Sequence, residues 1–98
     1  MTISNIKRIL KDQKPFLSQK YGIKEIGIFG SYVKSSQHSK SDLDILIDLE
    51  ITPDFSLLDL LKLEEYLSEK TGLKVDLAVK KNLRKRIGRR ILAEVQYI

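Results

Sequence analysis

Apolar side chains recur at helical spacing in three long segments of the sequence. The first, residues 3–21, contains Pro15, so we expect a kink or break there, followed by a short turn of helix. The second begins after Ser56, whose pairing with Asp59 is typical of a capping box, carries a broad stripe of leucines, and ends at Gly72. Two well-defined helices are therefore predicted, one on each side of the middle of the chain.

The last helical segment is both amphipathic and strongly basic. We expect Asn82 to cap this helix. The apolar side chains that should face inward are Leu83, Ile87, Ile91, Leu92 and Val95. The basic run comprises Lys80, Lys81, Arg84, Lys85, Arg86, Arg89 and Arg90. Such a run is as typical of a solvated helix face as of a docking surface for an acidic partner.

Three shorter segments rich in Ile, Leu and Val predict strands. One ends at Gly30, one spans residues 43–49, and one spans residues 73–79. The middle segment is apolar almost throughout, which favours a central position in a sheet. Between the first two, residues 31–36 could start a short helix, and a polar loop with His38 follows that we expect to be solvated. The pattern predicts a small α/β layer structure with a sheet of three to four strands.

Length and composition narrow the possible classes of protein. A chain of 98 residues suits a single domain, 1–98, and its 42% apolar and 32% charged residues exclude general disorder. The absence of cysteine excludes a disulfide framework or zinc–thiolate site, and the single histidine excludes a multi-histidine metal site. We see no signal peptide or membrane span, so a reduced, cytoplasmic setting is expected. The net charge of +5 suits an anionic partner.

Two carboxylates stand at the beginning of the middle strand. Because side chains alternate along a strand, Asp42 and Asp44 should project from the same face while Leu43 points into the core. Neighbouring carboxylates repel and raise each other's pKa, and a hard divalent cation removes that conflict. Magnesium suits this pair because it combines a few carboxylate oxygens with water and phosphate oxygens. Two such ions can together activate an attacking oxygen and stabilise a leaving one.

Asp76 occupies a similar place in the third strand, alone among apolar residues. If that strand lies beside residues 43–49, three carboxylates converge. Gly30 allows close approach of the backbone to a ligand, and a helix starting there, with the hydroxyl of Ser31, could bind phosphate. The simpler interpretation is that Asp42 caps a turn and that Asp76 lies on a solvated face. We favour the catalytic interpretation for the set as a whole.

The order Gly30-Ser31, ten residues, Asp42-Leu43-Asp44 and a later Asp76 resembles the nucleotidyltransferase superfamily related to DNA polymerase beta. More narrowly, the chain resembles the minimal nucleotidyltransferases, the MntA-type antitoxins. The segments that carry this likeness are "KYGIKEIGIFGSY", "SDLDILID", "LSEKTGLKVDLAV" and "RRILAEVQYI". The resemblance implies the nucleotidyltransferase fold, in which the small sheet is mixed and flanked by helices.

The resemblance also implies roles for individual residues. Asp42 and Asp44 would bind Mg²⁺ together with a nucleoside triphosphate, and Asp76 would be the third catalytic and metal-binding carboxylate, helping to activate the acceptor hydroxyl. Gly30 and Ser31 would hold phosphate. Lys34 stands where many relatives have arginine, and it could meet phosphate as a point charge without the bidentate fork of arginine.

For activity and partners, the resemblance implies transfer of AMP from ATP to a tyrosine of a HEPN ribonuclease toxin, in a hetero-oligomer in which the modified toxin is silenced. Two other functions are open: nucleotidyl transfer to a small molecule, and a non-catalytic antitoxin that neutralises its partner by binding. No aromatic residues interleave with the basic run, so direct binding of nucleic acid is not expected.

Overall fold

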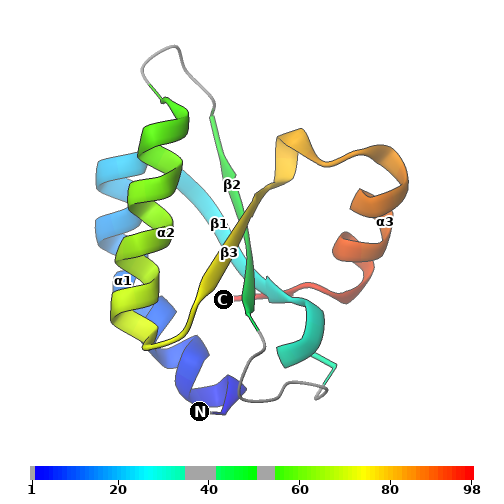
Figure 1. Ribbon diagram of the computed structural model, residues 1–98, viewed down its shortest axis with the longest axis horizontal. Coiled ribbons are helices and arrows are strands. Elements are labelled where there is room, and N and C mark those ends of the chain that lie inside the picture. Colours follow the sequence, from blue (N-terminus) through cyan, green and yellow to red (C-terminus); the bar gives the residue numbers. More distant parts are fainter. Residues whose placement is uncertain (1, 35–41, 51–54) are drawn as a thin grey trace.

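The computed structural model describes residues 2–34, 42–50 and 55–98 (Figure 1). The predicted polar loop with His38 lies outside these residues. Along the chain the elements are α1 (Ile3–Tyr21), β1 (Ile23–Phe29), the 3-10 turn η1 (Gly30–Tyr32), β2 (Leu43–Leu49), α2 (Leu57–Thr71), β3 (Val75–Val79), the 3-10 turn η2 (Lys80–Asn82), α3 (Lys85–Glu94) and β4 (Gln96–Tyr97). None of the helices in the described ranges is long and apolar enough to cross a membrane.

The strands form one mixed sheet in the order β3-β2-β1-β4. Strand β2 runs parallel to β3 and antiparallel to β1, and β4 adds a short antiparallel edge to β1. The predicted α/β class with a small mixed sheet is confirmed, and so is the internal position of β2. This arrangement places the beginning of β2 beside the beginning of β3, which is where the aspartates lie.

The core lies between one face of the sheet and helices α1 and α2, while α3 lies on the opposite side (Figure 1). Side chains alternate along β2, so one face is fully apolar and the other carries Asp44, Leu46 and Asp48. The fully buried side chains that form the core interface are Leu43, Ile45, Ile47 and Leu49 of β2, Ile6, Leu10 and Leu17 of α1, and Leu63 and Leu67 of α2. The core thus fixes β2 firmly while its polar face points away from α1 and α2.

Helix α1 continues through Pro15 without interruption, so the predicted break is wrong. Proline removes one intrahelical hydrogen bond, but its ring lies on the exposed side of the helix. Leu10 and Leu17 are buried on either side of it and hold both halves of the helix against the sheet. Tertiary packing therefore outweighs the local preference of proline to end a helix.

Helix α2 has the predicted boundaries but buries only part of its apolar stripe. The capping box of Ser56 and Asp59 is present, and Gly72 ends the helix in the left-handed conformation. Leu63 and Leu67 are buried, whereas the exposed fractions are 72% for Leu57, 58% for Leu58 and 52% for Leu61. The first turns of α2 therefore present leucine side chains to solvent.

The C-terminal segment differs most from the prediction. Asn82 ends the turn η2 and does not cap α3, which begins three residues later at Lys85 after Arg84. Within α3 only Ile91 of the predicted apolar side chains is buried, whereas Ile87 and Leu92 are exposed, contrary to the expected inward orientation.

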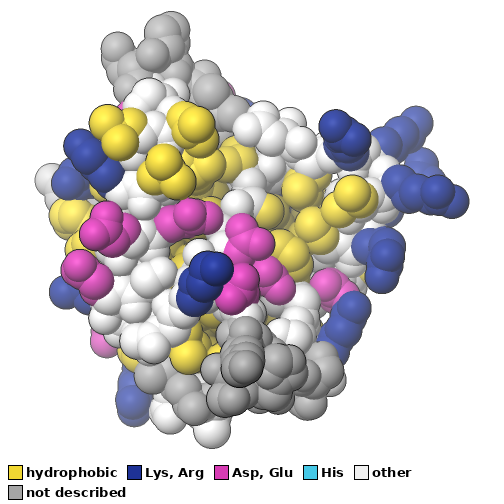
Figure 2. Space-filling view, viewed as in Figure 1, with side chains coloured by type: hydrophobic (Ala, Val, Ile, Leu, Met, Phe, Trp, Pro, Cys, Tyr) yellow, Lys and Arg dark blue, Asp and Glu magenta, His cyan; other side chains and the backbone are white. Residues whose placement is uncertain are grey.

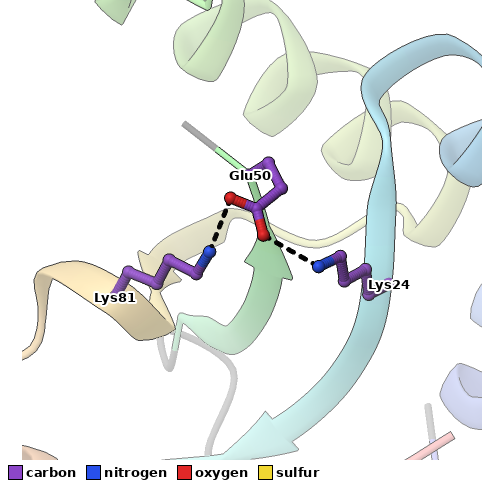
Figure 3. A network of polar contacts seen from close by, with 3 residues as sticks. All are labelled: Lys24, Glu50 and Lys81. Carbon is purple, nitrogen blue, oxygen red and sulfur yellow. Dashed lines mark hydrogen bonds and ion pairs between the residues drawn. The ribbon is translucent and has the colours of Figure 1, made fainter. Parts of the chain in front are cut away.

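An exposed ion-pair network links β1, η2 and the residue after β2, at the end of the sheet where β2 ends (Figure 3). Glu50, which follows β2, pairs with Lys24 of β1 at 2.8 Å and with Lys81 of η2 at 2.9 Å. The hydrogen bond from Lys24 is the largest cause that lowers the pKa of Glu50 to about 2, followed by that from Lys81. Lys80 in turn pairs with Glu25 at 3.5 Å, so the first two members of the basic run help to fix η2 against the sheet.

Candidate active site

Asp44 and Asp76 occupy directly paired positions in the parallel strands β2 and β3. Asp42 lies two residues before Asp44, just ahead of β2, and the backbone N–H of Leu43 donates to the carbonyl of Lys74 at 2.8 Å. The two strand ends are thus fixed side by side. The expectation that β3 would lie beside β2 and bring Asp76 close to Asp44 is confirmed as geometry.

The environment of Asp44 disfavours its charged form. Its side chain is half-buried, and burial is the main cause that raises its pKa to about 6 from an ordinary value of 3.8. The neighbouring charges of Asp76, Asp42 and then Glu94 raise this pKa further. Within the described residues no lysine or arginine forms an ion pair with Asp44. Such a carboxylate is typical of a position that a cation occupies during function.

Asp76 lies on the exposed edge of the sheet, yet its backbone is held on both sides. Towards the interior, β3 pairs with β2. Towards the outside, Val75 N–H donates to Ser68 Oγ at 3.0 Å, and Leu77 N–H donates to Glu64 Oε2 at 2.9 Å. Helix α2 therefore covers the free edge of β3 with its own polar side chains. Asp76 combines a fixed backbone with a solvent-facing carboxylate, which suits contact with an incoming group.

Gly30 lies against the carboxylate of Asp44. The glycine directly follows β1 with φ of +78°, in the left-handed region, and a Cβ atom built there would be 2.1 Å from Asp44 Oδ2. Only a residue without a side chain fits this position without displacing Asp44. The described part of the predicted helix at 31–36 is the single turn η1, in which the N–H groups of Val33 and Lys34 both donate to the carbonyl of Gly30. Ser31 lies half-buried in this turn.

The structure adds Glu94, a residue that the sequence interpretation missed. Its Oε1 accepts a hydrogen bond from Gly30 N–H at 3.1 Å, and its Oε2 lies 3.0 Å from Lys34 Nζ. The hydrogen bond from Lys34 is the largest cause that lowers the pKa of Glu94, and the bond from Gly30 lowers it further. Glu94 is the only acidic residue after Asp76, but no local pattern in the sequence links it to Gly30.

The charged side chains are unevenly distributed around this site. Figure 2 shows acidic side chains gathered in the middle of one face, with exposed apolar side chains above them and lysine and arginine side chains on the side of α3. The exposed apolar side chains of the described residues include Leu57, Leu58 and Leu61 of α2 and Ile87 of α3. A partner with apolar and acidic surface would complement it.

The oxygen-only donor set fits magnesium better than softer metals. Among the residues that the structure describes, no three His, Cys, Asp or Glu side chains are already gathered to hold a metal ion. Magnesium does not need such a cage, since it is usually held by one or two carboxylates together with water and substrate phosphates. The raised pKa of Asp44 beside Asp42 and Asp76 is the specific observation that favours a cation here.

Comparisons with known proteins agree with this geometry. Over its full length the chain is 44% identical to protein adenylyltransferase MntA of Thermococcus cleftensis, covering 97% of that protein. It also resembles a solved structure of a provisionally assigned minimal nucleotidyltransferase, with 26% identity, a TM-score of 0.78, and coverage of 98% of this chain and 95% of the other.

A more distant solved structure, a tri-AMPylated HEPN toxin from Shewanella oneidensis in complex with its MNT antitoxin, shares the fold with 19% identity and a TM-score of 0.62. The match covers 96% of this chain and 66% of that one. The family model for the nucleotidyltransferase domain matches residues 10–98. The chain therefore belongs to the nucleotidyltransferase domain family, which confirms both the predicted family and the predicted class of enzyme.

Proposed function

We propose that this protein is a magnesium-dependent protein adenylyltransferase, which transfers AMP from ATP to a tyrosine of a HEPN-type ribonuclease toxin and thereby acts as an antitoxin. The observation that carries the proposal is the pairing of Asp44 with Asp76 across β2 and β3, next to the Gly30 turn. The full-length likeness to protein adenylyltransferase MntA supports the same activity.

The carboxylates have distinct roles in this proposal. Asp42 and Asp44 would hold magnesium, with Asp76 as the third carboxylate of the site and two ions in the complete site. Magnesium when bound supplies positive charge that orients the triphosphate and offsets charge developing on its oxygens. Asp76 accepts the proton of the acceptor hydroxyl, consistent with its exposed carboxylate on a fixed strand.

The transfer itself is a substitution at phosphorus. The acceptor oxygen forms a bond to the α-phosphorus of ATP, the bond from that phosphorus to the bridging oxygen breaks, and pyrophosphate leaves. Gly30 permits close approach of the phosphates, while Ser31 and Lys34 contribute polar and charged contacts to them. ATP as donor is in keeping with a toxin–antitoxin structure of the same fold that was solved with AMP-PNP, at 22% identity and a TM-score of 0.71.

Two observations support a protein as the acceptor: the exposed surface of α2 and α3, and the solved structure of a modified toxin with its antitoxin. Exposed leucines of α2 and the basic α3 provide apolar and positively charged surface for a partner. The AMPylated HEPN toxin seen with its MNT antitoxin shows the kind of product that we expect, in that relative. The absence of cysteine is compatible with a reducing cytoplasm, where we place the reaction.

The decisive test is incubation of this protein with ATP, magnesium and a candidate HEPN-type ribonuclease toxin, followed by intact mass measurement of both chains. We expect the HEPN protein to gain one or more AMP units on a tyrosine, and its ribonuclease activity to stay low after this protein is removed. Modified toxin that cleaves RNA as fast as unmodified toxin would favour the non-catalytic antitoxin. AMP transfer to small hydroxyl compounds, with none to the HEPN protein, would favour the small-molecule enzyme.

A further inference from the structure

Glu94, from the far end of the chain, closes a ring of contacts around the Gly30 turn. Gly30 N–H donates to Glu94 Oε1 at 3.1 Å, Lys34 Nζ lies 3.0 Å from Glu94 Oε2, and Lys34 N–H donates back to the Gly30 carbonyl at 3.1 Å. Both bonds to Glu94 are charge-assisted and hence stronger than neutral hydrogen bonds. The carboxylate therefore fixes both ends of the turn at once.

The position of Glu94 is itself fixed by the sheet. The next residue, Val95, packs over Gly27, where a Cβ atom would lie only 2.6 Å from Val95 Cγ2. The following residues form β4, which pairs with β1 through Gly27 and Ile28. The exposed fraction of the Glu94 side chain is only 22%. Glu94 is thus a fixed carboxylate aimed at the turn.

A negative charge at this place is costly for a site that binds an anion. Glu94 is one of the charges that disfavour ionisation of Asp44, and it would also repel a triphosphate. Pairing with Lys34 offsets that charge. Since lysine has three donors, Lys34 can contact Glu94 and still offer an N–H to a phosphate oxygen.

We propose that Glu94 is a positioning residue of the nucleotide site, which holds the Gly30 turn in the shape that admits a triphosphate beside Asp44 and which orients the ammonium group of Lys34. This inference rests on the proposed function, because it deepens the account of the same site. In this role Glu94 acts only through its contacts with Gly30 and Lys34 and does not itself contact the substrate.

The first measurement is the affinity of the nucleotide-free protein for AMP-PNP in the presence of magnesium, by calorimetry. Loss of two charge-assisted contacts in Glu94→Ala should weaken binding about tenfold. Glu94→Gln retains an acceptor for Gly30 N–H but loses the ion pair, so a smaller loss is expected. Glu69→Ala removes an exposed glutamate from the last turn of α2 and should leave affinity unchanged, as the matched control.

A double-mutant comparison tests whether Glu94 acts through Lys34. If it does, Glu94→Ala should weaken binding less in a Lys34→Ala background than in the unaltered protein. Equal losses in both backgrounds would overturn the part of the proposal that concerns Lys34. Should Glu94→Ala fail to fold, Glu94→Gln takes its place in the same comparison.

The second measurement, hydrogen exchange of the Gly30 amide in nucleotide-free protein, does not depend on activity. Exchange should be slow in the unaltered protein and in Glu94→Gln, and faster in Glu94→Ala. Unchanged exchange in Glu94→Ala would overturn the proposal. Faster exchange with unchanged AMP-PNP affinity would also overturn it and leave Glu94 a structural role alone.

Two further outcomes separate this inference from the proposed function. Tighter AMP-PNP binding by Glu94→Ala would overturn the inference, because it would make Glu94 a competitor of phosphate. Failure of the unaltered protein to bind AMP-PNP with magnesium would overturn the proposed function and, with it, a positioning role at a nucleotide site. A protected Gly30 amide would then show only that the contact with Glu94 exists.

Discussion

Asp44 and Glu94 both lie against Gly30, yet their surroundings push their charges in opposite directions. Asp44 occupies the space where a Cβ of Gly30 would be, and burial raises its pKa to about 6. Glu94 accepts a hydrogen bond from Gly30 N–H and forms an ion pair with Lys34. The hydrogen bond from Lys34 is the main cause that lowers the pKa of Glu94. One carboxylate is held where its charge is poorly compensated, and the other has two donors of its own.

This difference separates a group that awaits a ligand from a group that maintains the site. A carboxylate whose charge is uncompensated in the free protein gains most when a cation arrives. A carboxylate that is already paired gains little from a ligand, but its loss leaves its donors without an acceptor. Substitution at Asp44 should therefore affect chemistry first, and substitution at Glu94 should affect the shape of the turn first.

The largest expected effect is the loss of nucleotidyl transfer in Asp44→Asn. The amide cannot supply the negative charge that magnesium requires, so transfer to the partner should fall below detection while the fold is kept. Asp48→Asn is the matched control, since Asp48 lies on the same face of β2 but at its other end. AMP incorporation measured by mass is the readout. Undiminished transfer by a folded Asp44→Asn protein would remove the metal role from Asp44.

Asp76→Asn should have the next largest effect, and this effect should be on turnover much more than on nucleotide affinity. If Asp76 takes the proton of the acceptor, turnover should fall by about 10²–10⁴, the usual contribution of general acid–base catalysis. ATP affinity should change much less, since the exposed carboxylate of Asp76 lies at the sheet edge. Turnover and AMP-PNP affinity are compared in the same variant. Equal losses in both would instead make Asp76 a binding residue.

Gly30→Ala tests whether the position of the Asp44 carboxylate depends on the absence of a side chain at residue 30. A methyl group would lie within 2.1 Å of Asp44 Oδ2, so Asp44 must move. A displacement of about 1 Å in an active site can reduce the rate about 10²-fold.

Gly72→Ala provides a control for backbone strain. Gly72 has φ of +72°, but nothing lies within 4 Å of its missing Cβ. Both variants should lose about 1–2 kcal/mol of stability from the left-handed backbone, measured by urea unfolding. Only Gly30→Ala should also lose transfer. Similar transfer in the two variants would show that contact with Asp44 is unimportant.

The features that could be predicted from the sequence depend on neighbours along the chain. Period-two alternation placed Asp44 on the face of β2 opposite Leu43 and Ile45, and the capping box of Ser56 and Asp59 set the start of α2. Each of these signals is complete within a few residues, so no knowledge of the tertiary structure is needed to interpret it. The motif spacing then identified the family.

The features that could not be predicted depend on contacts between distant segments. Glu94 reaches Gly30 across 64 positions of the chain, and nothing in its local sequence indicates that contact. The two-residue strand β4 is too short for periodicity to predict, and it exists because Gly27 leaves room for Val95. The turn η2 shifted the start of α3 to Lys85, and how far that helix packs on the sheet, which leaves Ile87 exposed, depends on contacts outside the local sequence.

The smallest expected effect is on stability, where Asp44 and Glu94 should give opposite signs. The folded-state pKa of Asp44 is raised to about 6 from 3.8. The stabilising contribution of its neutral form is therefore present below about pH 4 and is lost as the pH rises through about 6. At pH 7 without magnesium, Asp44→Asn should unfold a few degrees higher than the unaltered protein, and the difference should disappear near pH 4. Asp48→Asn, at the other end of the same face of β2, is the control and should show no such rise.

Glu94 should behave in the opposite way because its folded-state pKa is lowered. Its contribution to stability is present above the ordinary value of 4.5 and is lost as the pH falls through its lower folded-state pKa. Glu94→Gln should therefore unfold at a lower temperature than the unaltered protein at pH 7, and the gap should narrow in acid. Thermal unfolding of both variants at several pH values, with a chelator present, makes the comparison. If Asp44→Asn and Glu94→Gln shift the midpoint in the same direction at pH 7, the distinction between a carboxylate that awaits a cation and one that is already paired is wrong.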